Sequence, residues 1–295
     1  YVDIQNHNSI KLASGLYSPQ STEEIFPLEI FSYLTITGVP GETILDAESL
    51  SRVIKFDNST NCNLKNLEIR NGSASSYGGG IECWFSSPII ENVKVANNYT
   101  SSDGGGMFLY GSNPTLINVS VINNHAAGNG GGIRFWQADA NINNLLVADN
   151  LASGSGGGIY TSSSDIIFSS SHIIDNSASG TGGGIYCSAY TETTLINSIS
   201  WNNLPQEIYS GFASDVIVSY SDIQNGIDGI SIDDEDLSWL EGNIDSDPLF
   251  VGTGTHPFAL SENSPCIDAG TLELPEGIVL PAFDLAGNPR ICGGS

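Results

Sequence analysis

The sequence predicts an all-β protein, a single-stranded parallel β-helix with three short strands in each 26-residue coil. Three observations predict it: a glycine triplet that recurs at a fixed period, aliphatic columns with the same period, and a column of asparagines. The triplet Gly-Gly-Gly stands at 78–80, 104–106, 130–132, 156–158 and 182–184, always 26 residues apart. Helical repeats are longer and need better helix formers than the Gly, Ser, Asn and Thr of these units.

Each unit contains three segments in which apolar and polar residues alternate. If the first glycine of a triplet is position 0, the apolar residues occupy positions 3 and 5, 10 and 12, and 15 and 17. Position 12 holds Ile90, Leu116, Ile142 and Phe168. Alternation places such residues on one side of a strand, so identical columns are expected to stack inside the coil at about 4.8 Å.

The repeat divides the chain into four expected parts. Residues 1–51 are predicted to form N-terminal coils, and residues 52–207 six regular 26-residue coils with a one-residue slip after Gly182. Residues 208–248 are predicted to form irregular coils with a solvated acidic loop. Residues 249–295 are predicted to form a segment that packs on the solenoid or extends it.

An asparagine column at position 20 is predicted to form a ladder inside a corner of the coil. Its members are Asn98, Asn124, Asn150 and Asn176. An inward amide can bond its counterparts on the neighbouring coils, and asparagine tolerates the left-handed backbone of a bend. The second column, at position 14, is interpreted in the same way; it contains Asn66, Asn92, Asn118 and Asn144.

The repeat motif, Gly-Gly-Gly-Ile followed by Ser-x-Pro and Asn-Asn-x-Ala, resembles that of right-handed parallel β-helix repeat proteins of the pectate-lyase-like superfamily. It is most similar to the polymorphic-outer-membrane-protein-like members, and it covers residues 52–207. The resemblance implies right-handed coils and a secreted, extracellular or bacterial cell-surface location. It does not fix the chemistry, because such proteins include lyases, hydrolases and adhesins.

Charge and hydropathy exclude two classes of partner. The chain has 33 acidic and 8 basic residues and a formal net charge of −25. A phosphate backbone would be repelled, so no nucleic acid is expected as a partner. No run approaches the roughly 20 apolar residues of a membrane span, so no membrane insertion is expected.

The first strand of each coil carries the best candidate for a binding site. If positions 3 and 5 face inward, positions 4 and 6 face solvent. The candidate carbohydrate-binding residues are Glu82, Trp84, Phe108, Tyr110, Arg134, Trp136, Tyr160 and Tyr186. Exposed aromatic patches of this size mark binding sites, and the outward triplet glycines would border them as a trough. The alternative is a ladder of rings that only stabilises the sheet.

Asp139 and Asp165 share position 9 on neighbouring coils and form the candidate metal site. Two like charges so close would recruit calcium, or would serve as an acid and base pair. The alternative is that both are turn residues that cap the local backbone. No cofactor is required, and Ca²⁺ is the one ion the sequence suggests.

The five cysteines do not form a disulfide framework. Cys83 and Cys187 are predicted to be small buried hydrophobes, because they share a column but lie four coils apart. The sequence leaves the pairing of Cys266 with Cys292 open.

These features predict a secreted or cell-surface protein that binds a polysaccharide or cell-surface glycan, or acts in adhesion, without catalysis. The first alternative is a polysaccharide lyase or glycoside hydrolase. Catalysis is the less favoured interpretation because Arg134 is the one basic residue on the candidate face, whereas polyuronate cleavage needs several cations. The second alternative is a fibre subunit that self-associates end to end or side by side.

Overall fold

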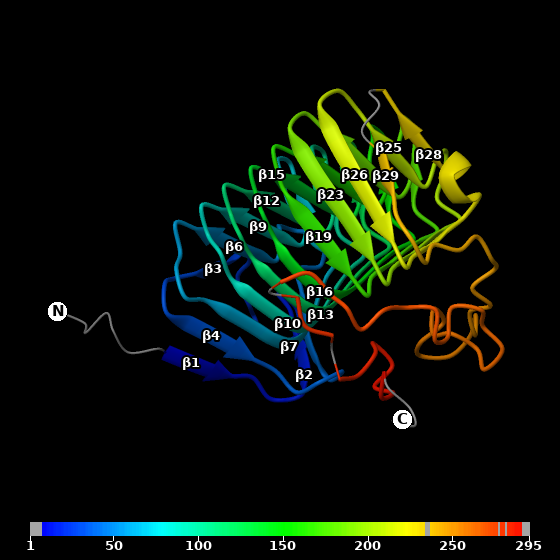
Figure 1. Cartoon of the computed structure of the whole chain (residues 1–295). Coiled ribbons are helices and arrows are strands. Elements are labelled where there is room, and N and C mark those ends of the chain that lie inside the picture. The colour runs from blue at the N-terminus through cyan, green and yellow to red at the C-terminus, as the bar shows by residue number, and fades with distance from the viewer. Residues whose placement is uncertain (1–7, 234–236, 277, 281, 291–295) are drawn as a thin grey trace.

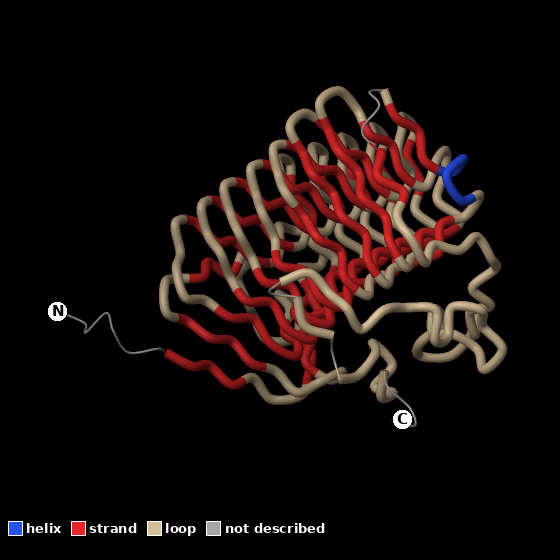
Figure 2. Tube along the Cα trace, in the orientation of Figure 1, coloured by secondary structure: helices blue, strands red, loops and turns tan. Residues whose placement is uncertain are grey.

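The computed structural model describes residues 8–233, 237–276, 278–280 and 282–290. The chain winds into a right-handed parallel β-solenoid of about nine turns, which confirms the predicted fold class (Figure 1). Figure 2 shows strands and loops almost throughout, and the one helix in the described residues is a 3₁₀ turn, η1 (Gly226–Gly229). No helix in this part of the chain is long and apolar enough to cross a membrane.

The first strand of each coil belongs to a nine-stranded parallel sheet. Its members are β3 (Leu28–Ile30), β6 (Ile54–Asp57), β9 (Ile81–Trp84), β12 (Met107–Tyr110), β15 (Ile133–Trp136), β18 (Ile159–Ser162), β22 (Ile185–Ser188), β25 (Ile208–Ser210) and β28 (Ile230–Ile232). Neighbouring strands pair with a shift of one repeat, so each repeat position forms a column along the solenoid.

The second and third predicted segments belong together to a fifteen-stranded sheet. Its members are β1 (Asn8–Lys11), β2 (Gly15–Tyr17), β4 (Leu34–Thr37), β5 (Thr43–Asp46), β7 (Asn63–Arg70), β10 (Ile89–Ala96), β13 (Thr115–Ile122), β16 (Asn141–Ala148), β19 (Ile166–Ser169), β20 (His172–Ile174), β23 (Thr191–Ile196), β24 (Ile199–Trp201), β26 (Ser214–Ser219), β27 (Asp222–Ile223) and β29 (Leu237–Trp239). The predicted one-residue slip is present, because Ile166 of β19 pairs with Thr193 of β23.

A third, five-stranded sheet closes five successive coils with strands of two residues, which the sequence pattern did not predict. Its members are β8 (Ser73–Ala74), β11 (Tyr99–Thr100), β14 (His125–Ala126), β17 (Leu151–Ala152) and β21 (Ser177–Ala178). Such short strands show no alternation that could be read. The coil still has three strands, but two predicted segments are one long strand in β7, β10, β13 and β16.

The asparagines at position 20 lie inside a corner and form a continuous hydrogen-bonded ladder. Asn98, Asn124, Asn150 and Asn176 are all buried. The amide of Asn124 donates to Oδ1 of Asn150 at 3.0 Å, and that of Asn150 donates to Oδ1 of Asn176 at 2.9 Å. Asn203 adds a fifth member after the slip, since it accepts the next bond at 2.9 Å.

The third glycine of each triplet faces this ladder, so the prediction that it points outward was wrong. A Cβ on Gly80 would lie 2.8 Å from Nδ2 of Asn98, and one on Gly132 would lie 3.0 Å from Nδ2 of Asn150. Glycine is needed there because the ladder amide fills the space that a side chain would take. No trough of exposed glycines borders the aromatic residues.

The asparagines at position 14 do bend the strand, but their side chains lie outside the coil. Their φ angles lie between 51° and 63°, the left-handed region that asparagine tolerates. The amide of Asn92 donates to Asn66 at 3.1 Å, and that of Asn118 donates to Asn92 at 3.0 Å. Asn92 is exposed, so the prediction of a second internal column was wrong.

After β29 the chain runs back along the outer face of the fifteen-stranded sheet, in orange to red in Figure 1. Phe250, Phe258 and Leu285 cover a small apolar cluster that includes Leu146 and Ile174. The Sγ of Cys266 donates to Oδ2 of Asp222 at 3.0 Å. Cys292, Asp234, Glu235 and Asp236 lie outside the described residues, so the pairing with Cys292 and the acidic loop stay predictions. Cys83 and Cys187 are fully buried.

Candidate functional site

Four aromatic residues on the outer side of the nine-stranded sheet form the surface that we call the aromatic surface. They are Trp84, Phe85, Tyr110 and Trp136. Because β9, β12 and β15 pair in register, the ring of Tyr110 lies 4.8 Å from that of Trp84 and 5.0 Å from that of Trp136. Phe85, which the sequence did not single out, is 53% exposed and meets Tyr110 edge to face at 5.1 Å.

The rings of the aromatic surface are inclined to one another and half-buried. The planes of Trp84 and Tyr110 differ by 56°, and those of Tyr110 and Trp136 by 71°. The surface is therefore ridged, with ring faces and edges both presented, and it is not the flat row that the sequence suggested. Such geometry is usual for aromatic pairs, because inclined rings align the positive edge of one with the negative face of another.

Three predicted surface residues are buried, so their predicted exposure was wrong. They are Glu82, Phe108 and Arg134. Residues at the start of a coil, or just before it, lie over this part of the sheet. Tyr77 stacks on Phe108 at 4.3 Å, and Arg52 forms an ion pair with Glu82.

Arg134 is 8% exposed and its guanidinium is held by its surroundings. It lies 4.0 Å from the ring centre of Tyr160 and 5.7 Å from that of Trp136, so it forms cation–π contacts with both. It donates to the carbonyl of Phe135 at 2.7 Å and to Oγ of Ser162 at 2.9 Å. Burial lowers the pKa of Arg134. A guanidinium in this position supports the rings and is not presented to a ligand.

Over the next coils, tyrosines occupy the position of Arg134 on their strands and form a stack. Tyr160 and Tyr186 lie 4.6 Å apart, and Tyr186 and Tyr209 lie 5.3 Å apart with planes that differ by 3°. Tyr209 was missed because the coil after Gly182 is shorter and the 26-residue count no longer finds its column. Its hydroxyl donates to Asp233 at 2.6 Å, which raises the pKa of Tyr209 to about 12.

The predicted metal residues Asp139 and Asp165 lie on neighbouring coils and are exposed. Oδ1 of Asp139 accepts the N–H of Asp165 at 2.8 Å, and Oδ1 of Asp165 accepts the N–H of Glu192 at 3.1 Å. Both carboxylates thus cap backbone N–H groups, as the alternative interpretation of these two residues expected. Over the described residues, no three His, Cys, Asp or Glu side chains group as a metal site would require. Calcium at Asp139 and Asp165 stays a prediction.

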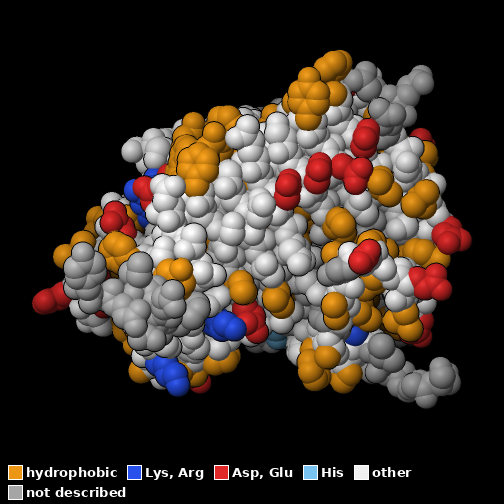
Figure 3. All heavy atoms as spheres, turned by 60° about the vertical axis from the view of Figure 1, so that its left-hand side comes forward, with side chains coloured by type: hydrophobic (Ala, Val, Ile, Leu, Met, Phe, Trp, Pro, Cys, Tyr) orange, Lys and Arg blue, Asp and Glu red, His pale blue; other side chains and the backbone are white. Residues whose placement is uncertain are grey.

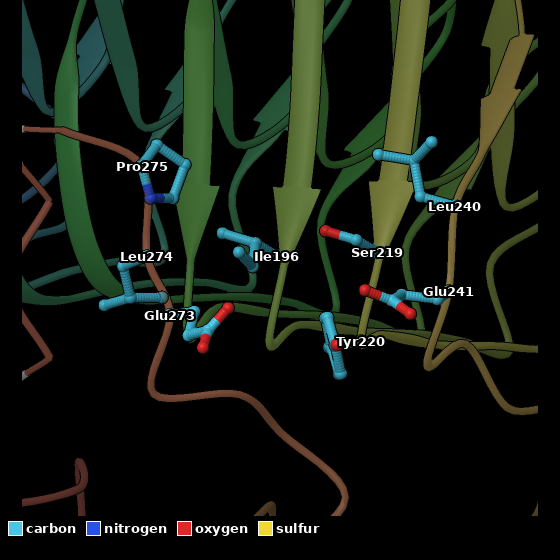
Figure 4. Close-up of a pocket in the computed structure, with 8 residues that line it drawn as sticks. All are labelled: Ile196, Ser219, Tyr220, Leu240, Glu241, Glu273, Leu274 and Pro275. Carbon is cyan, nitrogen blue, oxygen red and sulfur yellow. The ribbon is translucent and has the colours of Figure 1, made fainter.

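A groove of about 500 Å³ lies between the C-terminal segment and the end of the fifteen-stranded sheet (Figure 4). Its lining residues are Ile196, Ser219, Tyr220, Leu240, Glu241, Glu273, Leu274 and Pro275. Tyr220 lies between Glu241 and Glu273 in Figure 4. Its hydrogen bond to Glu241 raises the pKa of Tyr220. The sequence pattern could not predict this groove, because residues 271–276 belong to no repeat.

Comparison with known proteins supports the fold. Residues 140–265 match the model of the family described as NosD, periplasmic copper-binding protein. The structure is similar to the crystal structure of pectate lyase Pel9A over 96% of this chain and 88% of that chain, with a TM-score of 0.57 and 15% identity. The predicted resemblance to pectate-lyase-like parallel β-helix proteins is confirmed at the level of fold.

Two further comparisons add nothing to that conclusion. A pectin methylesterase from Yersinia enterocolitica is similar over 77% of this chain and 76% of its own, with 14% identity and a TM-score of 0.36. A TM-score that low carries no argument about fold or activity. No curated protein matches the sequence.

Proposed function

We propose that the protein binds a polysaccharide along the aromatic surface, outside the cytoplasm and without catalysis. The observation that carries the proposal is the run of half-buried rings, Trp84, Tyr110 and Trp136, on three consecutive coils. Sugar rings pack their apolar C–H faces on aromatic rings, and their hydroxyls stay in contact with water at the rim. Regular coils present one ring for each step of about 4.8 Å, which suits a linear polymer better than a single sugar.

The comparisons support a polysaccharide as partner and a location outside the cytoplasm. Pectate lyase, which shares the fold, acts on a polysaccharide, and the matching family model is named for a periplasmic protein. We infer from them a polymeric carbohydrate partner and a compartment outside the cytoplasm.

The matching family is named for copper binding, but the described residues of this chain do not fit a copper site. Soft ligands are suited to copper, but Met107, Cys62, Cys83 and Cys187 are buried in the core. Cys266 is half-buried, and its Sγ donates to Asp222. No His, Cys, Asp and Glu side chains of the described chain gather in threes around one point. We therefore derive no function from copper.

The double variant Trp84→Ala, Trp136→Ala tests the proposal. Affinity electrophoresis would measure binding to a neutral β-glucan, polygalacturonate and chitosan at a temperature well below the melting transition. Each lost ring is expected to remove about 1–2 kcal/mol of binding, so the dissociation constant should rise tenfold or more. Some loss of stability is expected too, because Trp84 also packs on Phe108 at 5.6 Å.

Phe108→Leu is the matched control. Phe108 belongs to the same ring cluster but is fully buried, so this change should lower the melting temperature and leave glycan binding unaltered. If both variants lose stability and neither changes the binding of any glycan, the rings serve only as a stabilising ladder. Sedimentation velocity on the same samples tests the fibre alternative, which requires self-association.

The groove at Tyr220 supports a hydrolase as the alternative function, because the carboxylates of Glu241 and Glu273, from different segments, line it. Glycoside hydrolases use two carboxyl groups that flank the scissile bond. New reducing ends released from a polysaccharide, and lost in both Glu241→Gln and Glu273→Gln, would support this alternative. A lyase is less compatible, since the cation that would act on the aromatic surface, Arg134, is buried and hydrogen-bonded.

A further inference from the structure

Beside the aromatic surface, four exposed carboxylates form a column that we call the acidic row. They are Asp139, Asp165, Glu192 and Asp215. The first three are linked from coil to coil by the backbone bonds described above, and Glu192 pairs in register with Asp215. Figure 3 shows acidic side chains in a row along one face of the solenoid. Adjacent coils set them about 4.8 Å apart.

The acidic row continues the aromatic surface along the solenoid. It begins three residues after Trp136, on the coil where the aromatic surface ends. On the last two coils of the acidic row, an exposed aromatic residue precedes each carboxylate by two or three positions. Tyr190, 74% exposed, precedes Glu192, and Phe212, 69% exposed, precedes Asp215. A chain that lies on Trp84, Tyr110 and Trp136 and follows the coils would thus meet both rings and carboxylates.

The sequence places no lysine or arginine on the coils of the acidic row after Arg134. Every lysine and arginine of the sequence except Arg290 precedes Phe135. Arg290 lies on the fifteen-stranded sheet, where it donates to Oδ1 of Asn144 at 2.6 Å. Arg134 is buried between rings, so its charge is not offered to a ligand. A polyuronate on this surface would set carboxylate against carboxylate, with a net charge of −25 behind it.

We propose that the aromatic surface takes a cationic glycan, an amino-sugar polymer with free amino groups, whose ammonium groups face the acidic row. This inference rests on the proposed function and specifies its substrate class. Charge complementarity selects the occupant: the ammonium groups pair with the carboxylates and contact the faces of Tyr190 and Phe212, while the sugar rings pack on the aromatic surface.

The test uses chitosan oligosaccharides, the same oligosaccharides after complete N-acetylation, and polygalacturonate, each titrated calorimetrically into the full chain. The variant Asp165→Asn, Glu192→Gln, Asp215→Asn removes three charges and keeps the Asp165 side-chain oxygen that accepts the N–H of Glu192. The matched control Glu42→Gln, Glu262→Gln, Glu276→Gln removes three exposed charges elsewhere. Chitosan oligosaccharides should bind most tightly, and the acidic-row variant should weaken them tenfold or more while the control changes affinity less than twofold.

Several outcomes would overturn the inference. They are equal or tighter binding of the N-acetylated chain, equal loss in both triple variants, or binding of polygalacturonate, with or without calcium. If neutral glycans bind and the Trp84→Ala, Trp136→Ala variant loses them, the proposed function stands and the cationic ligand alone is rejected. If no glycan binds, both are rejected.

Discussion

Asn150 lies at the middle of the internal ladder, and its replacement by alanine tests how the solenoid is held together. Its Oδ1 accepts the backbone N–H of Asn124 at 2.9 Å and the side-chain amide of the same residue at 3.0 Å. Its Nδ2 donates to the carbonyl of Val121 and to Oδ1 of Asn176, both at 2.9 Å. Asn150→Ala removes all four bonds at once.

The magnitude follows from the groups left unpaired. The N–H of Asn124 loses its partner, and an unpaired buried polar group costs about 1–3 kcal/mol. The carbonyl of Val121, the amide of Asn124 and Oδ1 of Asn176 each lose one further bond. Water that enters the vacated space would recover part of this cost, because the site is polar. We expect the free energy of unfolding to fall by about 3 kcal/mol. The backbone adds no strain, since Asn150 does not have a positive φ.

Urea unfolding measures the change, and hydrogen exchange locates it, because a solenoid opens in neighbouring units. Protection should be lost first in the coils that contain Asn124 and Asn176. Asn92→Gly is the control: it removes an exposed ladder amide at φ 53°, where glycine is not strained, and should cost less than about 0.5 kcal/mol. If the two variants unfold at the same urea concentration, the internal ladder does not stabilise the coils.

Two further predictions concern the packing of neighbouring segments. In Gly131→Ala the new Cβ would lie 2.3 Å from the carbonyl oxygen of Gly157 on the next coil, so the coils must separate. The melting temperature should fall by more than in Gly252→Ala, where nothing lies within 4 Å and the left-handed backbone, φ 73°, is the one source of strain. His172 lies under Phe250, with Arg290 and Asp284 nearby, and burial lowers its pKa to about 4. Since an unfolded histidine titrates near 6.5, stability present above about pH 6.5 should be lost as the pH falls toward 4. Limited proteolysis of the C-terminal segment should show this loss, and His172→Asn should flatten the pH dependence.

The periodic part of the fold could be predicted from the sequence because the regular coils repeat the same residue types at the same positions. The 26-residue count locates β9, β12, β15, β18 and β22 of the nine-stranded sheet and the position of Asn150 in its corner. It could not locate β11 (Tyr99–Thr100), whose two residues show no alternation. The C-terminal segment has no repeat, so its contact between Arg290 and Asn144 has no sequence signal.

The candidate site was predicted less well than the fold, because alternation gives the side of a strand and not what covers that side. Phe108 does lie on the outer side of β12, yet Tyr77 from the preceding loop stacks on it and excludes water. Trp84 and Tyr110 lie two positions further along their strands and stay half-exposed, although Tyr77 also meets Trp84 edge to face at 6.0 Å. A single aromatic residue before one glycine triplet was too weak a signal to reveal the covering segment.

The two ends of the internal ladder show why a buried carboxylate in this protein is structural. At the N-terminal end the glycine triplet is absent and Gly72 takes the ladder position, where its N–H donates to Oδ1 of Asn98 at 2.7 Å. At the other end Asn203 still has an N–H and an amide to satisfy, and no other asparagine of the described residues continues the ladder. Glu207 supplies the acceptors, since Oε1 accepts the N–H of Asn203 at 3.0 Å and Oε2 accepts its amide at 2.5 Å. A carboxylate accepts at both oxygens without donating, which suits the last member of a directional ladder. Burial raises the pKa of Glu207, as it would in a catalytic acid, but both oxygens are occupied by the ladder and by Oγ of Ser200. The position therefore argues for a cap on the solenoid and against a role in catalysis.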